Sequence, residues 1–147
     1  MDIKQFLAQE QALINLRASD KPGLLHDLAA RAGTALEVAA ARVAAELLKR
    51  EQLGSTGTGG GVAIPHARMQ EVRRPFGVLA RLNQSIEFDA IDGQQVDIVF
   101  MLLLPSVAAG EHLTALAAVA RKLRDSERLG RLRRARKAED LYSALAD

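Results

Sequence analysis

Two histidines and a glycine-rich run supply the residue types from which a reactive site could be built. Residues 54–68 read Gly-Ser-Thr-Gly-Thr-Gly-Gly-Gly-Val-Ala-Ile-Pro-His-Ala-Arg, so the glycines lead into a short apolar segment and then His66. A glycine-rich backbone can turn tightly and expose N–H groups that surround an anion. The segment 62–64 is typical of a short buried strand that Pro65 should stop. We therefore expect His66 where a strand gives way to a loop, beside an anion site.

Two familiar glycine-rich motifs are absent. A P-loop needs a lysine followed by serine or threonine after its glycines, and no lysine occurs between Glu51 and Arg68. A dinucleotide fingerprint needs the spacing G-x-G-x-x-G between a strand and a following helix. Counted from Gly57 or Gly59, the third glycine falls on valine or isoleucine, and here a helix precedes the loop. Both nucleotide motifs are excluded.

The chemistry open to His66 and His112 is narrow. Two histidines without cysteine are too few for a structural zinc site, so no metal is expected. Ser55 lacks the G-x-S-x-G elbow of a serine hydrolase. A histidine nucleophile needs a neutral nitrogen aimed at phosphorus, and an imidazole with a pKa near ~6.5 is available in that form at neutral pH. Phosphoryl transfer depends mainly on positioning and charge stabilisation, with no cofactor.

A cradle for the three phosphoryl oxygens can be assembled from the same region. It would draw on hydroxyl groups, glycine N–H groups and one guanidinium. The expected members are Ser55, Thr56, Gly57, Gly59, Gly61 and Arg50.

Length and composition predict one domain, spanning residues 1–147. Apolar residues make up 48% and aromatic residues 3% of the chain, which indicates an aliphatic core. The chain has no cysteine, no apolar run of membrane-spanning length and no signal-peptide pattern, so we expect a cytoplasmic protein without membrane insertion. The net charge of +2 is too small to indicate nucleic-acid binding. The basic residues from Arg121 to Lys137 favour a solvated helical face over a docking patch.

The first half of the chain predicts two long helices around a strand. We expect a short helix at 3–9, a strand at 12–16, and a helix capped by Ser19 and Asp20 that Gly33 ends. His26 falls on the solvent side of that helix. A second helix is expected over 36–51 with Arg50 in its last turn, where a cation is favoured even without a function. Its buried stripe should be Leu36, Ala40, Val43, Ala44 and Leu47.

The second half predicts the centre of a sheet. Strands are expected at 75–82 and 86–88, paired across a turn at 83–85, and a continuous apolar run at 96–104 predicts a central strand buried on both faces. A helix should begin near residue 110, with His112 in its first turn, followed by helices at 126–136 and 138–145. The helix that begins near residue 110 should bury one face, made of Leu113, Leu116, Ala117, Ala120 and Leu123. The sequence thus predicts an α/β domain whose mixed sheet has helices on both faces.

Several of these segments together resemble one known family. The segments are Arg50-Glu51, residues 54–57, residues 62–66, residues 88–92, residues 96–98 and Glu111-His112-Leu113. They are similar to the active-site signature of the enzyme IIA proteins of the mannitol/fructose type in the bacterial phosphotransferase system. The resemblance covers nearly the whole chain and is nearest to the nitrogen-regulatory (PtsN-like) branch. Gly60 departs from the pattern, since many relatives carry asparagine there, and should loosen the loop.

The resemblance implies a fold, a reaction and partners. It implies the enzyme IIA mannitol/fructose-type fold, with His66 accepting a phosphoryl group from a phosphohistidine on a small carrier protein, HPr or its nitrogen-branch relative NPr. His112 would support the site, and Arg50 would face the acceptor. Nitrogen-branch members act as regulators whose phosphorylation state is read by sensor kinases and transporters. Two alternatives are a sugar-transport enzyme IIA that passes phosphate to an enzyme IIB, and a binding module that is not phosphorylated.

Overall fold

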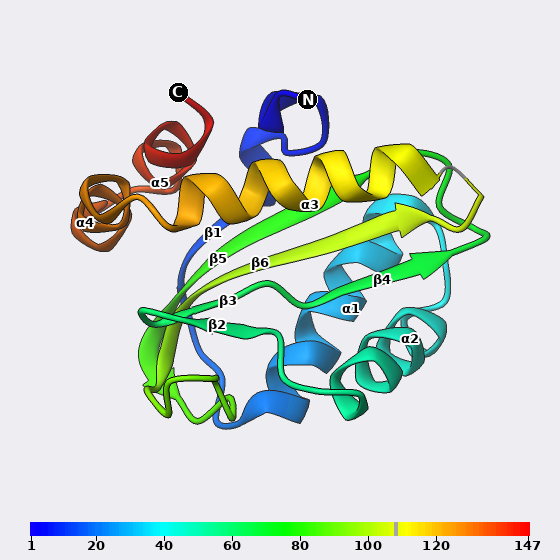
Figure 1. Cartoon of the computed structure of the whole chain (residues 1–147), viewed down its shortest axis with the longest axis horizontal. Coiled ribbons are helices and arrows are strands. Elements are labelled where there is room, and N and C mark those ends of the chain that lie inside the picture. The colour runs from blue at the N-terminus through cyan, green and yellow to red at the C-terminus, as the bar shows by residue number, and fades with distance from the viewer. Residues whose placement is uncertain (108) are drawn as a thin grey trace.

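A mixed six-stranded sheet lies between two layers of helices (Figure 1). The structure is a computed structural model that describes residues 1–107 and 109–147, without the side chains of residues 109–112. The strands are β1 (Ala12–Leu16), β2 (Gly57–Gly59), β3 (Val62–Ala63), β4 (His66–Met69), β5 (Phe76–Ile86) and β6 (Val96–Pro105). The helices are α1 (Lys21–Leu36), α2 (Ala40–Gln52), α3 (Ala109–Leu123), α4 (Ser126–Arg134) and α5 (Ala138–Ala146).

The sheet is organised around β6, which carries the longest apolar run of the chain. Its strand order is β1-β5-β6-β3-β2, and β4 also pairs with β6. β5 is antiparallel to β6, whereas β3 and β4 run parallel to it, and β1 is parallel to β5. The predicted mixed sheet is therefore confirmed.

Alternate side chains of β6 enter two separate cores, because successive residues of a strand point to opposite faces. One set packs with α1 and α2: Val99, Met101 and Leu103. The other set packs with α3, α4 and α5: Ile98, Phe100, Leu102 and Leu104. Both sets are almost completely buried, which confirms a central strand with helices on each face.

Near His66, β3 and β4 form one interrupted strand. Val62 lies opposite Ile98 and His66 lies opposite Leu102, so both segments keep the same register along β6. Pro65 lies in the interruption, where its carbonyl accepts the Leu102 N–H at 2.9 Å. The expectation that a loop follows Pro65 was wrong: the neighbouring β6 restores pairing at once, and His66 begins β4.

Several predicted boundaries in the first half differ from the structure. The expected helix at 3–9 is two short 3₁₀ turns, Ile3–Gln5 and Gln9–Gln11. α1 continues past Gly33, which is needed for close packing, since a Cβ there would lie 2.6 Å from the Val38 carbonyl oxygen. α1 ends instead at Glu37, whose φ of +57° is left-handed. As a result, Leu36 belongs to α1 and Ala40 is exposed; the rest of the predicted α2 stripe is buried.

Two predictions in the second half were also wrong. In place of the expected hairpin at 75–88, residues Phe76–Ile86 form a single strand, β5, which pairs with β6 from Phe76 to Arg81 and again at Ile86, with an irregular register between these two stretches. The buried face of α3 is only partly the predicted one: Leu123 is buried and Leu116 and Ala120 pack against the core, but Leu113 and Ala117 are exposed, because an alanine-rich helix offers more than one apolar stripe. Its buried residues are Ala115, Ala118, Val119 and Leu123, whereas Leu113 is 73% exposed. Among the described residues, no helix has the length and apolar character needed to cross a membrane.

Candidate functional site

His66 is held by the strand that precedes it. Its Nδ1 lies 2.9 Å from the carbonyl oxygen of Ile64, two residues earlier. A carbonyl oxygen can only accept a hydrogen bond, so Nδ1 carries the proton. In the neutral ring, the lone pair then belongs to Nε2. The backbone break at Pro65 therefore fixes both the orientation of the imidazole and its tautomer.

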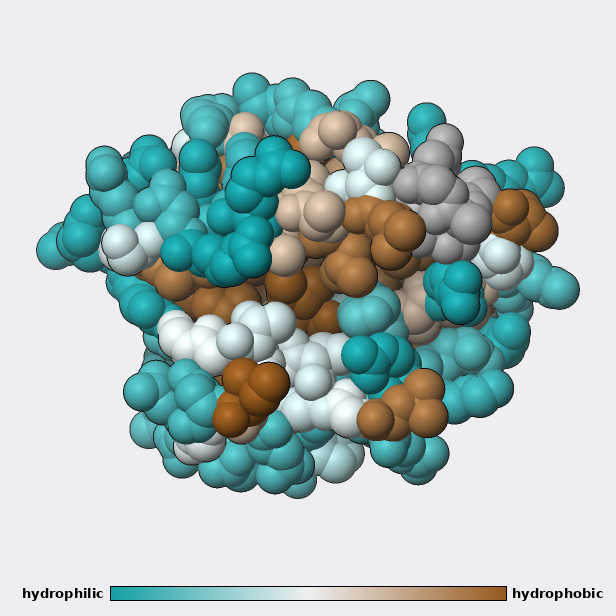
Figure 2. All heavy atoms as spheres, in the orientation of Figure 1, coloured by the Kyte–Doolittle hydropathy of each residue, from teal (hydrophilic) through white to brown (hydrophobic). Residues whose placement is uncertain are grey.

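The imidazole lines a cavity of about 640 Å³ between α2 and α3. The cavity walls are Glu46, Lys49, Arg50 and Leu53 from the α2 side, His66, Ala67 and Arg68 from β4, Leu104 from β6, and Leu113 and Leu116 from α3. Figure 2 shows hydrophobic residues gathered in the hollow beneath α3, with polar residues around them. The site thus combines cations with an apolar wall.

The surroundings of His66 favour its neutral form. Burial is the largest cause and lowers the pKa of His66 below its ordinary value of 6.5. The hydrogen bond to Ile64 and the charge of Glu51 act in the opposite direction, while the charges of Arg50 and Arg68 lower the pKa further. The net direction is downward, so His66 is an uncharged base with an available nitrogen near neutral pH.

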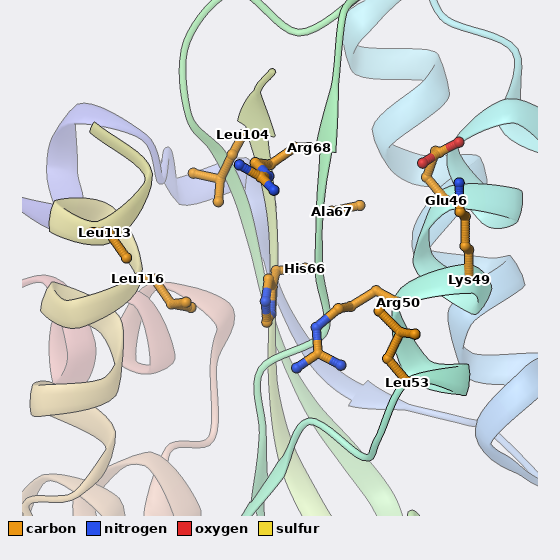
Figure 3. Close-up of a pocket in the computed structure, with 10 residues that line it drawn as sticks. All are labelled: Glu46, Lys49, Arg50, Leu53, His66, Ala67, Arg68, Leu104, Leu113 and Leu116. Carbon is orange, nitrogen blue, oxygen red and sulfur yellow. The ribbon is translucent and has the colours of Figure 1, made fainter. Parts of the chain in front are cut away.

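Arg50 lies where the sequence predicted, in the last turn of α2. Its guanidinium extends from the helix toward His66 (Figure 3). It donates one hydrogen bond from Nη1 to the Gly54 carbonyl at 2.9 Å. A guanidinium has five N–H groups, so donors remain for an anion held beside the imidazole.

Arg68 is a site residue that the sequence reasoning missed. It lies two residues after His66 on β4, and side chains two apart on a strand share one face. Arg68 lines the same cavity and its charge lowers the pKa of His66. The signal was present in the sequence, but it depends on knowing that the chain continues as a strand after Pro65.

The two hydroxyl residues of the expected cradle bond to the protein itself. Ser55 donates to the Phe88 carbonyl at 2.8 Å and accepts the Gly57 N–H at 3.0 Å. The Thr56 hydroxyl and N–H both bond to the Glu51 carboxylate. In the described part of the chain, neither residue lines the cavity around His66.

The glycine run builds a hairpin. β2 and β3 are antiparallel, and Gly59 at the end of β2 and Gly60 and Gly61 in the turn have positive φ angles of +102°, +68° and +81°. Gly60 is held rather than loose: its N–H bonds to Asp92 at 3.0 Å and its carbonyl to Arg133 at 2.7 Å.

Of the predicted phosphate ligands, the structure therefore brings Arg50 to His66 and places Gly57, Gly59 and Gly61 in the hairpin. None of these three glycines is among the described cavity residues. His112 lies in the first turn of α3, as predicted, but its side chain is outside the described part of the structure. No group of three or more metal-binding side chains occurs among the described residues.

This arrangement can carry an anionic group on nitrogen. Nε2 provides a nucleophile, Arg50 and Arg68 provide positive charge, and the apolar residues reduce access of water. A phosphoryl group suits these features, since its transfer requires a positioned nucleophile and charge stabilisation more than acid–base chemistry.

Comparison with known proteins identifies relatives along almost the whole chain. The family model described as "Phosphoenolpyruvate-dependent sugar phosphotransferase system, EIIA 2" matches residues 5–147. A nitrogen regulatory protein of Bradyrhizobium diazoefficiens is 43% identical over 146 residues, covering 99% of this chain and 95% of that protein. A nitrogen regulatory protein of Pseudomonas aeruginosa is 37% identical over the same shares.

Solved structures agree with this match. The nitrogen regulatory protein IIA-Ntr from Neisseria meningitidis superposes with a TM-score of 0.91 at 33% identity, covering 97% of this chain and 98% of that one. The IIA mannitol protein from Escherichia coli gives a TM-score of 0.80 at 18% identity, over 96% and 100% of the two chains. The second likeness shows the fold alone, and that fold is the one the sequence predicted.

Proposed function

We propose that Nε2 of His66 carries the phosphoryl group in this chain, which belongs to the EIIA 2 family of the phosphoenolpyruvate-dependent sugar phosphotransferase system and is a nitrogen regulatory phosphocarrier. The single observation that supports this role for His66 is the hydrogen bond from Nδ1 to the Ile64 carbonyl. That bond directs the lone pair of the neutral ring to Nε2.

The transfer step needs no proton movement. The Nε2 lone pair attacks the phosphorus of a phosphohistidine on the donor protein, whose other ring nitrogen carries a proton. The donor N–P bond breaks, and its electron pair stays on the donor ring, which leaves as a neutral imidazole. A new N–P bond forms on His66, and Nδ1 keeps its proton and its bond to Ile64. Because burial lowers the pKa of His66, only a small fraction of the molecules carry a protonated His66 ring that must lose its proton before it reacts.

Arg50 and Arg68 offset the negative charge of the phosphoryl group during and after transfer. Arg50 is the stronger candidate for direct contact, since its guanidinium is directed toward the imidazole (Figure 3). A guanidinium can bind two phosphoryl oxygens at once, and such charge-assisted bonds are about twice as strong as neutral ones. We assign His112 a supporting role on the α3 side of the site.

We infer that the donor is a small phosphocarrier protein of the HPr or NPr kind. The cavity of about 640 Å³ opens between helices, and exposed Leu53 and Leu113 flank it, which suits contact with another protein surface. Such a donor works in the cytoplasm, so the proposal also places the chain there. On this account the chain carries phosphate between proteins and does not turn over a substrate by itself.

The phosphorylated and free forms would differ by nearly two negative charges at the cavity. A partner that binds over the apolar wall can therefore distinguish the two forms. Regulatory targets such as sensor kinases or transporters are the partners that we propose for this readout.

The test is incubation of the purified chain with phosphorylated HPr and phosphorylated NPr from the same cell. We expect a gain of one phosphoryl group that is labile in acid and stable in alkali. His66→Ala should abolish the gain, whereas His26→Ala, a change on the exposed side of α1, should leave it intact. Labelling that survives in His66→Ala, or that maps to Ser55, would contradict the assignment.

A further inference from the structure

Glu51 is a charged residue in an unfavourable place. Glu51 is only 8% exposed, and Thr56 is the one other buried polar or charged residue among those that the structure describes. It also lies next to the last residue of α2, where the helix dipole disfavours an anion. A buried carboxylate needs several partners to offset its lost hydration. Those partners should reveal what the residue does.

The carboxylate of Glu51 joins three parts of the chain. Lys21, the first residue of α1, places its Nζ 2.7 Å from Oε2 of Glu51. The same Nζ donates to the Phe88 carbonyl at 3.3 Å and lies 4.6 Å from the centre of the Phe88 ring. On the other side, Thr56 donates its N–H at 3.2 and 3.3 Å and its hydroxyl to the carboxylate. Glu51 thus connects the start of α1, the end of α2 and the loop before β2.

These bonds fix the short connection that follows Arg50. Glu51 holds this connection twice, because its carbonyl accepts the Gly54 N–H at 3.1 Å and its carboxylate holds Thr56. Gly54 in turn presents its carbonyl to the Arg50 guanidinium at 2.9 Å. The carbonyl that orients Arg50 is therefore fixed between two contacts to Glu51.

We propose that Glu51 is a positioning residue, whose buried carboxylate holds the connection after α2 so that Arg50 faces His66. The inference rests on the proposed function, in which Arg50 stabilises the phosphoryl group. Glu51 does not itself line the cavity among the described residues. Its charge reaches His66 as a secondary influence, since it raises the pKa of the imidazole while Arg50 lowers it.

The test measures the rate of phosphoryl transfer from phosphorylated HPr to the full chain. Glu51→Gln removes the charge and one acceptor, and should slow transfer about ten- to a hundredfold, the loss expected for one charge-assisted interaction. In an Arg50→Ala background, the same change should alter the rate by less than about threefold, because the residue through which Glu51 acts is already gone. A rate equal to wild type, or the same slowing in both backgrounds, would overturn the proposal.

Two further variants keep the test decisive. Thr56→Val removes one bond to the carboxylate without unpairing Lys21, and should slow transfer severalfold only when Arg50 is present. Thr56→Val serves as the test if Glu51→Gln fails to fold. A wild-type transfer rate in Thr56→Val would then overturn the proposal. Asp97→Asn is the matched control, since it weakens the 2.9 Å ion pair with Arg133 at the hairpin and should leave the rate unchanged.

A readout without phosphate separates this proposal from the proposed function. The Arg50 Nε–H should give an ordered signal by heteronuclear NMR relaxation in the wild type and a mobile one in Glu51→Gln. An Arg50 signal that stays ordered in Glu51→Gln would overturn the positioning role. If the wild type takes no phosphate but Arg50 loses order in Glu51→Gln, the positioning role stands and the phosphocarrier assignment fails.

Discussion

The protonation of His66 gives the sharpest prediction about the site. Burial lowers its pKa below 6.5, and the charges of Arg50 and Arg68 lower it further. For an unperturbed histidine, the neutral fraction falls from about 90% to about 10% between about pH 7.5 and about pH 5.5, roughly a tenfold loss of nucleophile. His66 should lose less than that, because its midpoint lies lower. Its ability to accept phosphate should therefore persist into mildly acidic solution.

The same shift predicts how folding stability depends on pH. Below about pH 6.5 the unfolded chain binds a proton at His66, whereas the folded chain stays neutral until its lower pKa is reached. The unfolded state holds more protons in that window, so stability rises with pH there. The contribution is complete above about pH 6.5 and is lost as pH falls through the folded pKa. His66→Gln should show a smaller loss of stability than wild type over this range.

Two measurements check the prediction. NMR titration of the histidine ring signals gives the midpoint of His66, with His26→Gln and His112→Gln used to assign the other two rings. Urea unfolding of wild type and His66→Gln between about pH 5.5 and about pH 7.5 gives the linked stability change. A His66 midpoint above 6.5 would refute the burial argument, and ring nitrogen shifts that place the proton on Nε2 would refute the tautomer.

Three further predictions concern the neighbours of His66. Arg50→Ala should slow transfer about ten- to a hundredfold, and Arg50→Lys less, because a lysine keeps the charge but loses the planar fork; equal rates for wild type and Arg50→Ala in quenched-flow assays would make Arg50 a surface cation. Arg68→Gln should slow transfer severalfold through charge alone, an effect that should shrink in high salt, and one that persists unchanged in salt would point to a direct contact. His112→Ala should be slow, losing roughly 1.5–3 kcal/mol of transition-state stabilisation, yet end singly phosphorylated by mass spectrometry. If His112→Ala transferred phosphate at the wild-type rate at low and high pH, His112 would have no part in the site, which would then consist of His66 and the two arginines.

The elements with strong local signals could be predicted from the sequence. The β6 run is apolar over the seven residues 98–104 and could be stable only between two helical layers, so its central place followed from burial alone. His66 was predicted as a site residue from the motif that ends in Pro65, and Arg50 mainly from the family resemblance; the structure places both side chains at one cavity. The membership of the EIIA 2 family was likewise predicted from motifs and confirmed by comparison.

The role of the glycine run depended on the tertiary structure. A glycine can occupy a tight turn or let the backbone approach a bound anion, and the local sequence does not show which of these two roles it has. The choice was made by β6, which pairs with β3 and folds residues 57–63 into a hairpin. The same strand restored pairing after Pro65, so that Arg68 joined His66 on one face. Distant strand pairing, rather than local propensity, decided which residues surround the histidine.

The sequence by itself determined the residue types of the site and the layers that hold it, because these follow from burial and from short-range geometry. It could not determine the partners of Glu51, which lie 30 residues before it in Lys21 and five after it in Thr56. Nor could it choose the buried face of α3, whose alanines fit more than one stripe. A contact between segments far apart in the chain, such as the ion pair of Lys21 with Glu51, exists only when the whole domain is assembled. The burial that lowers the pKa of His66 likewise depends on the assembled domain.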